Sequence, residues 1–254
     1  PTNKNRFYVG QDGGASITYD HGKTWVFYDN LCFSQFYAVS ADMRDPYWVY
    51  GGLQDNGTWG GPSRSLDRVG IINADWLSVG GGDGFYAQVD PTDPDTVYLE
   101  SQDGYLLRLD LQTTERKLIP PPEPEGEHFR FQWCTPLLIS AHDPKRLYYA
   151  AQYVFRSDDR GDNWTKISPD LTTGADRNSL PIMGKVPDGR TMSRHDGVQE
   201  WPSITELAES PLNPAVLWAG TDDGCLQMTR DGGKTWKNVA DRVRGVPKGT
   251  YVTR

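Results

Sequence analysis

One short pattern recurs along this chain and limits its fold more than any other feature does. Each copy starts with Asp or Asn before a proline, and two apolar residues follow after a gap of two. The copies begin at Asp45, Asp93, Asp143 and Asn213. At the same distance along the chain after each start lies a second polar landmark: Gln54, Gln102, Gln152 and Asp222, respectively. Two landmarks in register over four copies indicate an internal repeat, which predicts a solenoid, propeller or array.

A third landmark is the motif Ser/Thr-x-Asp-x-Gly-x-Thr/Ser-Trp, called an Asp-box. It is complete at 18–25 and 229–236, and a near copy at 157–164 carries Asn163 in place of the second Thr/Ser. In such a hairpin the Asp accepts turn N–H groups, the Gly adopts a positive φ and the Trp packs on the sheet. We therefore expect structural roles for Asp20, Trp25, Asp159, Trp164, Asp231 and Trp236.

The repeats predict an all-β chain, a β-propeller of four-stranded antiparallel blades. The 27 glycines, 18 prolines and 12% aromatic residues favour short strands and sharp turns. The last repeat, for example, reads as strands 203–209, 216–220, 225–229 and 235–239. We expect one propeller over 1–254, with a partial blade at 1–31, blades at 35–63, 81–117, 131–171 and 201–240, a strand at 250–254, and inserts at 118–130 and 172–200.

Two interpretations of the incomplete ends remain open. The pieces 1–31 and 250–254 either join to close a five-bladed ring, or the chain is part of a larger propeller or of tandem propellers. The second interpretation is favoured because the sequence stops within an expected strand.

These residues resemble the Asp-box, or bacterial neuraminidase repeat, superfamily of β-propellers over nearly the whole chain. The similarity is greatest to sortilin-like propeller domains of large secreted bacterial proteins, often labelled glycosyl hydrolases, and is carried by 49–57, 81–85, 90–104 and 251–254. It implies a secreted or periplasmic location and a second propeller or larger assembly. It implies the fold much more firmly than the function.

Charge and composition limit the partners. The net charge of −8, with Lys and Arg scattered, argues against nucleic acid and against an anionic membrane surface. No apolar stretch is long enough for membrane insertion. The four histidines show no ligand spacing, so neither a metal site nor a cofactor is expected. Cys32, Cys134 and Cys225 lie far apart and are interpreted as buried thiols, with one disulfide plus a free thiol as the alternative.

A ligand site is expected on the propeller face opposite the Asp-boxes, where turns between second and third strands meet the connections between blades. The candidate ligand-binding residues there are Asp83, Asp55, Trp133 and Trp201. Most acidic residues on this face also have a simple interpretation as turn formers. Asp83 differs because it lies in a glycine run at 80–84, which indicates close approach by a neighbouring loop or by a ligand.

Three functions fit these observations. The first is a binding or scaffold propeller that recognises a protein or glycan partner. The second, which overlaps with the first, is a subunit of a larger assembly. The alternative is a xyloglucanase-like glycoside hydrolase with paired carboxylates. Its catalytic candidates are Asp83 with Asp55 or Asp12, and Trp133, Trp201 and Trp76 would be sugar platforms. Sialidase chemistry is disfavoured because no arginines occupy matching positions of the repeats.

Overall fold

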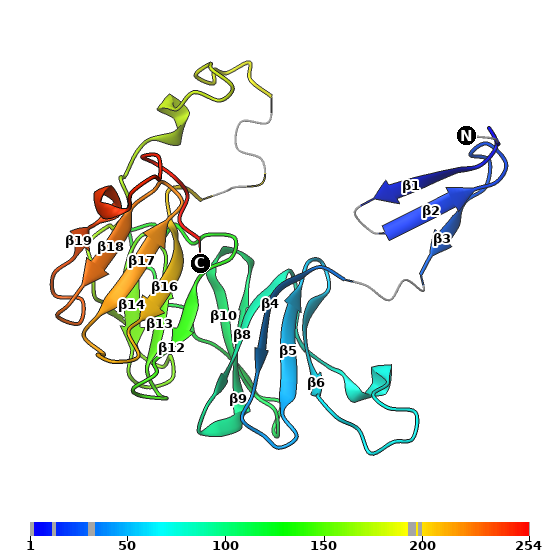
Figure 1. The fold of residues 1–254 in the computed structure, drawn as a ribbon, viewed down its shortest axis with the longest axis horizontal. Helices are drawn as coiled ribbons and strands as arrows, with labels where there is room; N and C mark the ends of the chain where they lie inside the picture. The colour runs from blue at the N-terminus through cyan, green and yellow to red at the C-terminus, as the bar shows by residue number, and fades with distance from the viewer. Residues whose placement is uncertain (1–2, 12–13, 30–33, 193–196, 198–199, 254) are drawn as a thin grey trace. The chain divides into compact units, whose positions relative to one another are not determined.

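The computed structural model describes residues 3–11, 14–29, 34–192, 197 and 200–253. The chain forms two compact units, Pro1–Gln35 and Phe36–Arg254. The first unit is a three-stranded antiparallel sheet of β1 (Phe7–Gln11), β2 (Gly14–Thr18) and β3 (Val26–Tyr28). The Asp-box of 18–25 forms the turn between β2 and β3 (Figure 1). We call this sheet the first blade.

The second unit consists of four four-stranded antiparallel sheets, each made from consecutive strands (Figure 1). We call them the second to fifth blades. The second has β4 (Phe36–Ala41), β5 (Trp48–Leu53), β6 (Gly57–Pro62) and β7 (Leu77–Gly80), and the third has β8 (Gly84–Asp90), β9 (Asp93–Ser101), β10 (Tyr105–Asp110) and β11 (Arg116–Leu118). The fourth has β12 (Leu137–Ile139), β13 (Leu147–Ala150), β14 (Val154–Ser157) and β15 (Thr165–Lys166), and the fifth has β16 (Ile204–Glu209), β17 (Leu217–Thr221), β18 (Leu226–Thr229) and β19 (Lys237–Asn238). The predicted all-β fold of four-stranded antiparallel blades is confirmed.

Helical structure in the described residues is limited to single 3-10 turns. They are η1 (Asn73–Asp75), η2 (Gln102–Gly104), η3 (Arg177–Ser179) and η4 (Ala240–Arg242). Within this described part of the chain, none is long or apolar enough to span a membrane.

The hydrophobic cores lie between neighbouring blades of the second unit. Tyr50 and Val79 of the second blade pack with Leu99 and Leu107 of the third. Two further cores join the third blade to the fourth and the fourth to the fifth, and include Tyr98, Leu137, Tyr149, Tyr148, Ile204 and Leu217. A smaller cluster consists of Phe129, Ala151 and Phe155. Burial between sheets is the main source of stability in such a stack, because a single sheet covers neither of its faces alone.

The second blade extends beyond the predicted end at residue 63. Its outer strand β7 pairs with β6, with Gly60 opposite Leu77. The intervening residues carry no Asp-box, so the motif spacing that located the other outer strands gave no signal here. Trp76 nevertheless packs over Gly61, where a side-chain Cβ would lie 2.6 Å from the indole.

The residues after the fifth blade follow its face without forming an assigned strand. Val252 donates its N–H to the Thr221 carbonyl at 3.0 Å, and the Thr205 hydroxyl donates to the Val252 carbonyl at 2.7 Å. The Val252 side chain covers Gly220, where any Cβ would collide with it. The predicted strand at 250–254 is thus an extended segment over 250–253, and residue 254 lies outside the described residues.

Candidate functional site

The Asp-box carboxylates are hydrogen-bonded within their own turns. Asp231 accepts from the Thr235 N–H at 2.9 Å and from the Thr235 hydroxyl at 2.6 Å. The bond from the Thr235 hydroxyl has the larger effect and that from the Thr235 N–H the next, and together they lower the pKa of Asp231 to about 2. Asp20 and Asp159 make the same pair of bonds to Thr24 and Asn163. Carboxylates held in this way are turn formers.

The Asp-box tryptophans differ in burial. The Trp164 indole N–H donates to the Ile119 carbonyl of the third blade at 2.7 Å, and the Trp236 indole N–H donates to the Ile167 carbonyl of the fourth blade at 3.0 Å. Both rings therefore fill the space next to the preceding blade. Trp25 was expected to pack on its sheet but is 45% exposed, with the Phe7 ring edge-on against it.

Asp83 connects the second and third blades. Its carboxylate Oδ1 accepts the backbone N–H of Asp55 at 2.8 Å, and its own N–H donates to Gln102 Oε1 at 3.0 Å. Its exposed fraction is only 8%, whereas Asp55 is exposed in a turn with φ of 59°. The two candidate residues predicted from sequence therefore do come together, with one fixing the backbone of the other.

The glycines around Asp83 differ in what surrounds them. Gly82 has a φ of +69°, and a Cβ there would lie 2.6 Å from Gln102 Oε1. The Gly84 backbone approaches that of Gly57 so closely that no Cβ fits. Neighbouring turns thus require glycine at these two positions. Gly81, in contrast, borders open space, because no atom lies within 4 Å of the place that a Cβ would occupy.

A polar cavity of about 480 Å³ lies at this point, and we call it the Asp83 cavity. Carboxylate, amide and hydroxyl groups line it together with glycine backbone: Asp55, Asn56, Gly57, Ser78, Gly80, Gly81, Gly82, Asp83 and Gln102. Trp133 and Trp201 are not among the lining residues. Asp12, the other proposed partner of Asp83, lies outside the described residues.

Trp133 approaches Asp83 through Tyr37, a residue that the sequence reasoning missed. The Tyr37 ring stacks on the Phe85 ring with centroids 4.3 Å apart. Burial raises the pKa of Tyr37, the negative charge of Asp83 raises it further, and a hydrogen bond with Trp133 lowers it. Tyr37 and Trp133 thus form an aromatic pair near Asp83. Tyr37 lies near the start of the inner strand β4, and this position was the one signal that could have identified it.

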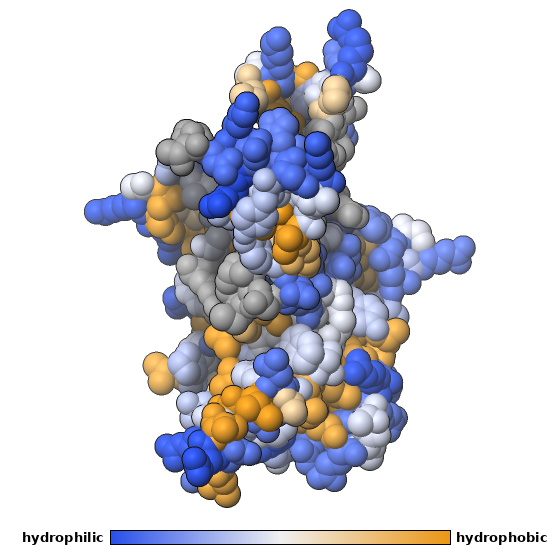
Figure 2. Space-filling view, turned by 90° about the vertical axis from the view of Figure 1, so that its right-hand side faces the viewer, coloured by the Kyte–Doolittle hydropathy of each residue, from blue (hydrophilic) through white to orange (hydrophobic). Residues whose placement is uncertain are grey.

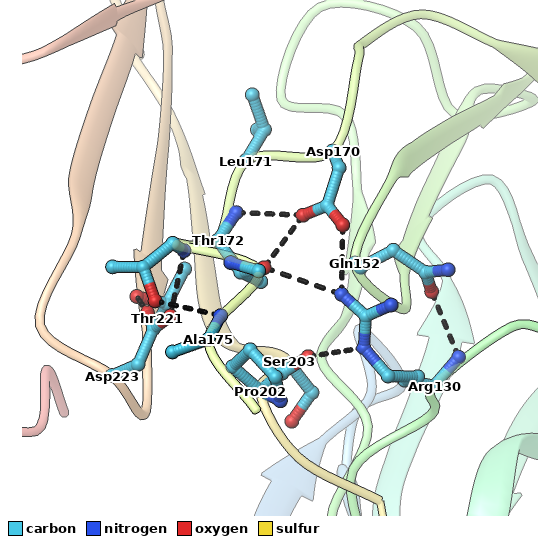
Figure 3. Close-up of polar contacts among 12 residues, drawn as sticks. Arg130, Gln152, Asp170, Leu171, Thr172, Ala175, Pro202, Ser203, Thr221 and Asp223 are labelled. Carbon is cyan, nitrogen blue, oxygen red and sulfur yellow. Dashed lines mark hydrogen bonds and ion pairs between the residues drawn. The ribbon is translucent and has the colours of Figure 1, made fainter. Parts of the chain in front are cut away.

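Trp201 directly precedes a different polar cluster, in which Arg130 contacts Pro202 and Asp170 (Figure 3). Trp201 is half-buried and precedes Pro202, whose carbonyl accepts from Arg130 Nε at 2.7 Å. Arg130 Nη2 also pairs with Asp170 at 2.8 Å. Nearby, His128 contacts Glu200 at 3.0 Å and Glu123 at 3.4 Å. The hydrogen bond with Glu200, and to a smaller extent that with Glu123, raises the pKa of His128. The ends of both long inserts are fixed here.

Several carboxyl groups on the same face are perturbed by burial. Burial raises the pKa of Asp222 to about 6, although Ser203 donates two hydrogen bonds to it. Burial also raises the pKa of Asp103, and the charge of Glu200 adds to the effect. No group of three or more potential metal ligands occurs among the described residues. Cys225 is a buried free thiol, and Cys32 lies outside the described residues.

In the face shown in Figure 2, hydrophobic residues form small patches separated by hydrophilic ones. Small patches of this kind are ordinary on folded proteins. The Asp83 cavity is the polar cavity that two of the predicted site residues, Asp55 and Asp83, line together.

Comparison with known proteins identifies the fold only. No family model and no curated protein sequence matches the chain. An ancestral GH74 enzyme is 14% identical with a TM-score of 0.56, over 98% of this chain and 31% of that one. The extracellular domain of a protein described as a one-component system of B. thetaiotaomicron is 13% identical with a TM-score of 0.52, over 97% and 28%.

A third solved structure, YCF48 bound to a D1 peptide, is 14% identical with a TM-score of 0.47, over 98% of this chain and 68% of that one. The chain spans less than a third of the length of the GH74 enzyme and of the B. thetaiotaomicron domain. In fold, this chain is similar to Asp-box-type β-propellers, at low sequence identity.

Proposed function

We propose that this chain is a binding module of a secreted or periplasmic protein, and that it recognises a glycan or protein partner through the Asp83 cavity. The observation that carries the proposal is the lining of that cavity. Asp55, Asn56 and Gln102 present carboxylate and amide groups beside exposed glycine backbone. Such groups both donate and accept hydrogen bonds, which suits a hydroxyl-rich ligand such as a glycan.

The neighbouring aromatic pair supports the same proposal. Tyr37 and Trp133 lie beside Asp83, and each is only partly buried. A flat aromatic face next to polar groups is suited to stacking against a sugar ring or to anchoring a peptide side chain. Trp201 is joined in sequence to Pro202, which accepts a hydrogen bond from Arg130, so we assign it a supporting role in holding the insert at 172–200.

The hydrogen bond of Asp83 favours binding over catalysis. A general acid or base must reach the reacting group directly or through one water. Asp83 is largely buried and its Oδ1 is held by the Asp55 N–H at 2.8 Å. We therefore assign Asp83 a positioning role and assign direct ligand contact to Asp55 and Asn56.

A glycoside hydrolase is the second candidate, and one observation favours it: two carboxylates, those of Asp55 and Asp83, line one cavity. In an inverting enzyme two such groups would lie roughly 6.5–9.5 Å apart, one as acid and one as base. Turnover by this chain would then depend on both carboxylates equally.

The test compares three variants by glycan array and titration calorimetry. Asn56→Ala removes a ligand group at an exposed position and is expected to reduce affinity about tenfold with an unchanged melting temperature. Asp83→Asn keeps an oxygen that can accept the Asp55 N–H, so we expect folding and most of the binding to persist. Asp83→Ala removes that acceptor and should lower both affinity and melting temperature, since the Asp55 N–H loses its partner.

Asp231→Asn, in an Asp-box turn, is the matched control and should leave affinity unchanged. Product release from an oligosaccharide that is abolished in Asp83→Asn would favour the hydrolase. Full binding by Asn56→Ala together with Asp55→Ala would show that the ligand does not use this cavity.

A further inference from the structure

The Asp-box tryptophan occupies one defined register position in each blade. In the fourth blade, Arg156 pairs with Thr165, so the preceding Trp164 lies opposite Ser157. In the fifth blade, Met228 pairs with Lys237, so the preceding Trp236 lies opposite Thr229. The second blade has Trp76 at this position, opposite Gly61. The equivalent position of the third blade lies opposite Leu109, and there the chain has Arg116.

The consequence of a tryptophan at this position is visible at the other blade interfaces. Trp164 fills the space against the third blade and donates to the Ile119 carbonyl, and Trp236 does the same against the Ile167 carbonyl of the fourth blade. The ring thus closes the outer part of the interface with the preceding blade. Arg116 cannot do this, because a guanidinium is charged and strongly disfavours an apolar interior.

A cavity of about 400 Å³ occurs where Arg116 replaces the tryptophan. Leu99 and Leu107, both buried core residues, form its apolar floor, and Tyr105 is 51% exposed beside them. Ser101 and Gln102 supply polar atoms at one end. We call this space the Arg116 pocket. It shares Gly80–Gly82 and Gln102 with the Asp83 cavity but has a different floor.

The charge in the pocket is not neutralised by the described residues. Arg108 and Lys117, which flank this position in the third blade, both pair with Asp162, whereas Arg116 makes no ion pair within the part of the chain described. Glu100 contributes to the lining, but its carboxylate accepts the Thr135 N–H of the fourth blade at 3.0 Å and so points to the other side of the sheet.

We propose that the Arg116 pocket binds a planar aromatic carboxylate. The apolar floor would accept a ring in the space that an indole closes at the other interfaces, and Arg116 would pair with the carboxylate. Arginine is suited to this because its planar fork binds carboxylates through two parallel hydrogen bonds. Such a ligand is either a free aromatic acid or the last residue of a peptide that ends in an aromatic side chain. The proposal does not depend on the function assigned to the Asp83 cavity.

Indole-3-acetate is the probe for the free acid, and uncharged indole is its control. Titration of the intact chain is expected to give an affinity for indole-3-acetate about tenfold above that for indole, as a charge-assisted hydrogen bond provides. Arg116→Ala should bind both probes equally. The peptide Gly-Gly-Trp, with a free or an amidated C-terminus, distinguishes the second source, because only the free carboxylate should compete with indole-3-acetate.

Arg116→Trp restores the residue found at the other interfaces and should fill the pocket. We expect it to lose binding of all probes and to raise the melting temperature. Arg230→Trp, at an exposed arginine of the fifth blade, is the matched control and should retain binding. Should Arg116→Trp fail to fold, Leu107→Phe tests the same occlusion from the floor. Unchanged binding in Arg116→Trp would overturn the proposal, as would unchanged binding in Leu107→Phe where Arg116→Trp does not fold. So would the absence of binding of any probe at millimolar concentration.

Discussion

At the scale of single residues, the same carboxyl group is used in two opposite ways. Asp231 lies in an exposed turn, and its hydrogen bonds to Thr235 lower its pKa to about 2. Asp222 lies beside Ser203 at the start of the fifth blade, and burial raises its pKa to about 6. Hydrogen bonding stabilises the charged form and burial destabilises it, so the environment decides which effect is larger.

Asp222 gives a prediction about pH. A carboxyl whose folded pKa lies above its ordinary value of 3.8 contributes stability at low pH, and that stability is lost as pH rises from about 4 to 6. Asn can accept the Ser203 N–H through Oδ1 and donate its amide N–H to the Ser203 hydroxyl, without the charge. We therefore expect Asp222→Asn to have the larger gain in melting temperature at pH 8 and little gain at pH 4. Thermal melts of the variant and the wild type at both pH values check it; an equal difference at both pH values would contradict the assigned pKa.

At the scale of elements, the tryptophans that close the blade interfaces carry much of the packing. Trp236 packs on the core shared by the fourth and fifth blades and donates a hydrogen bond to the Ile167 carbonyl. Its neighbours on β19, Lys237 and Asn238, are exposed. One side chain thus attaches a two-residue strand to the preceding blade.

Replacement of Trp236 by Ala should lower the free energy of unfolding by about 3 kcal/mol, because a large aromatic contact and its hydrogen bond are lost. Leu212→Ala is the control, since Leu212 is 92% exposed and should cost little. Denaturant titration measures both. Equal stability of Trp236→Ala and the wild type would remove the role assigned to this ring.

The sequence predicted those elements whose landmarks are local. In the fifth blade the expected strands 203–209, 216–220 and 225–229 correspond to β16, β17 and β18. Strand β7 was not predicted, because its turn lacks an Asp-box and only pairing with β6 defines it. Likewise Asp55 and Asp83 could be placed on one face, but the contact of Tyr37 with Trp133 depends on packing between strands far apart in sequence. The Arg116 pocket required the register of three strands.

At the scale of the whole molecule, neighbouring blades bury their residues pairwise, and polar cavities and clusters lie at the turns and connections between them. The Asp83 cavity forms where a connection between blades meets the turn of the preceding blade. The Arg130 cluster forms at an equivalent junction and holds the ends of both inserts. Departures from the repeat, such as the glycine run and the inserts, therefore coincide with the polar sites.

Hydrogen–deuterium exchange with and without the best-binding oligosaccharide from the array tests the central claim most directly. The account predicts that the ligand slows exchange at 54–58, 78–84 and 101–103, the segments that line the Asp83 cavity. Exchange in the Asp-box turns at 157–164 and 229–236 should stay unchanged. Protection confined to those turns, with none at 54–58 or 78–84, would contradict the assignment of the binding face.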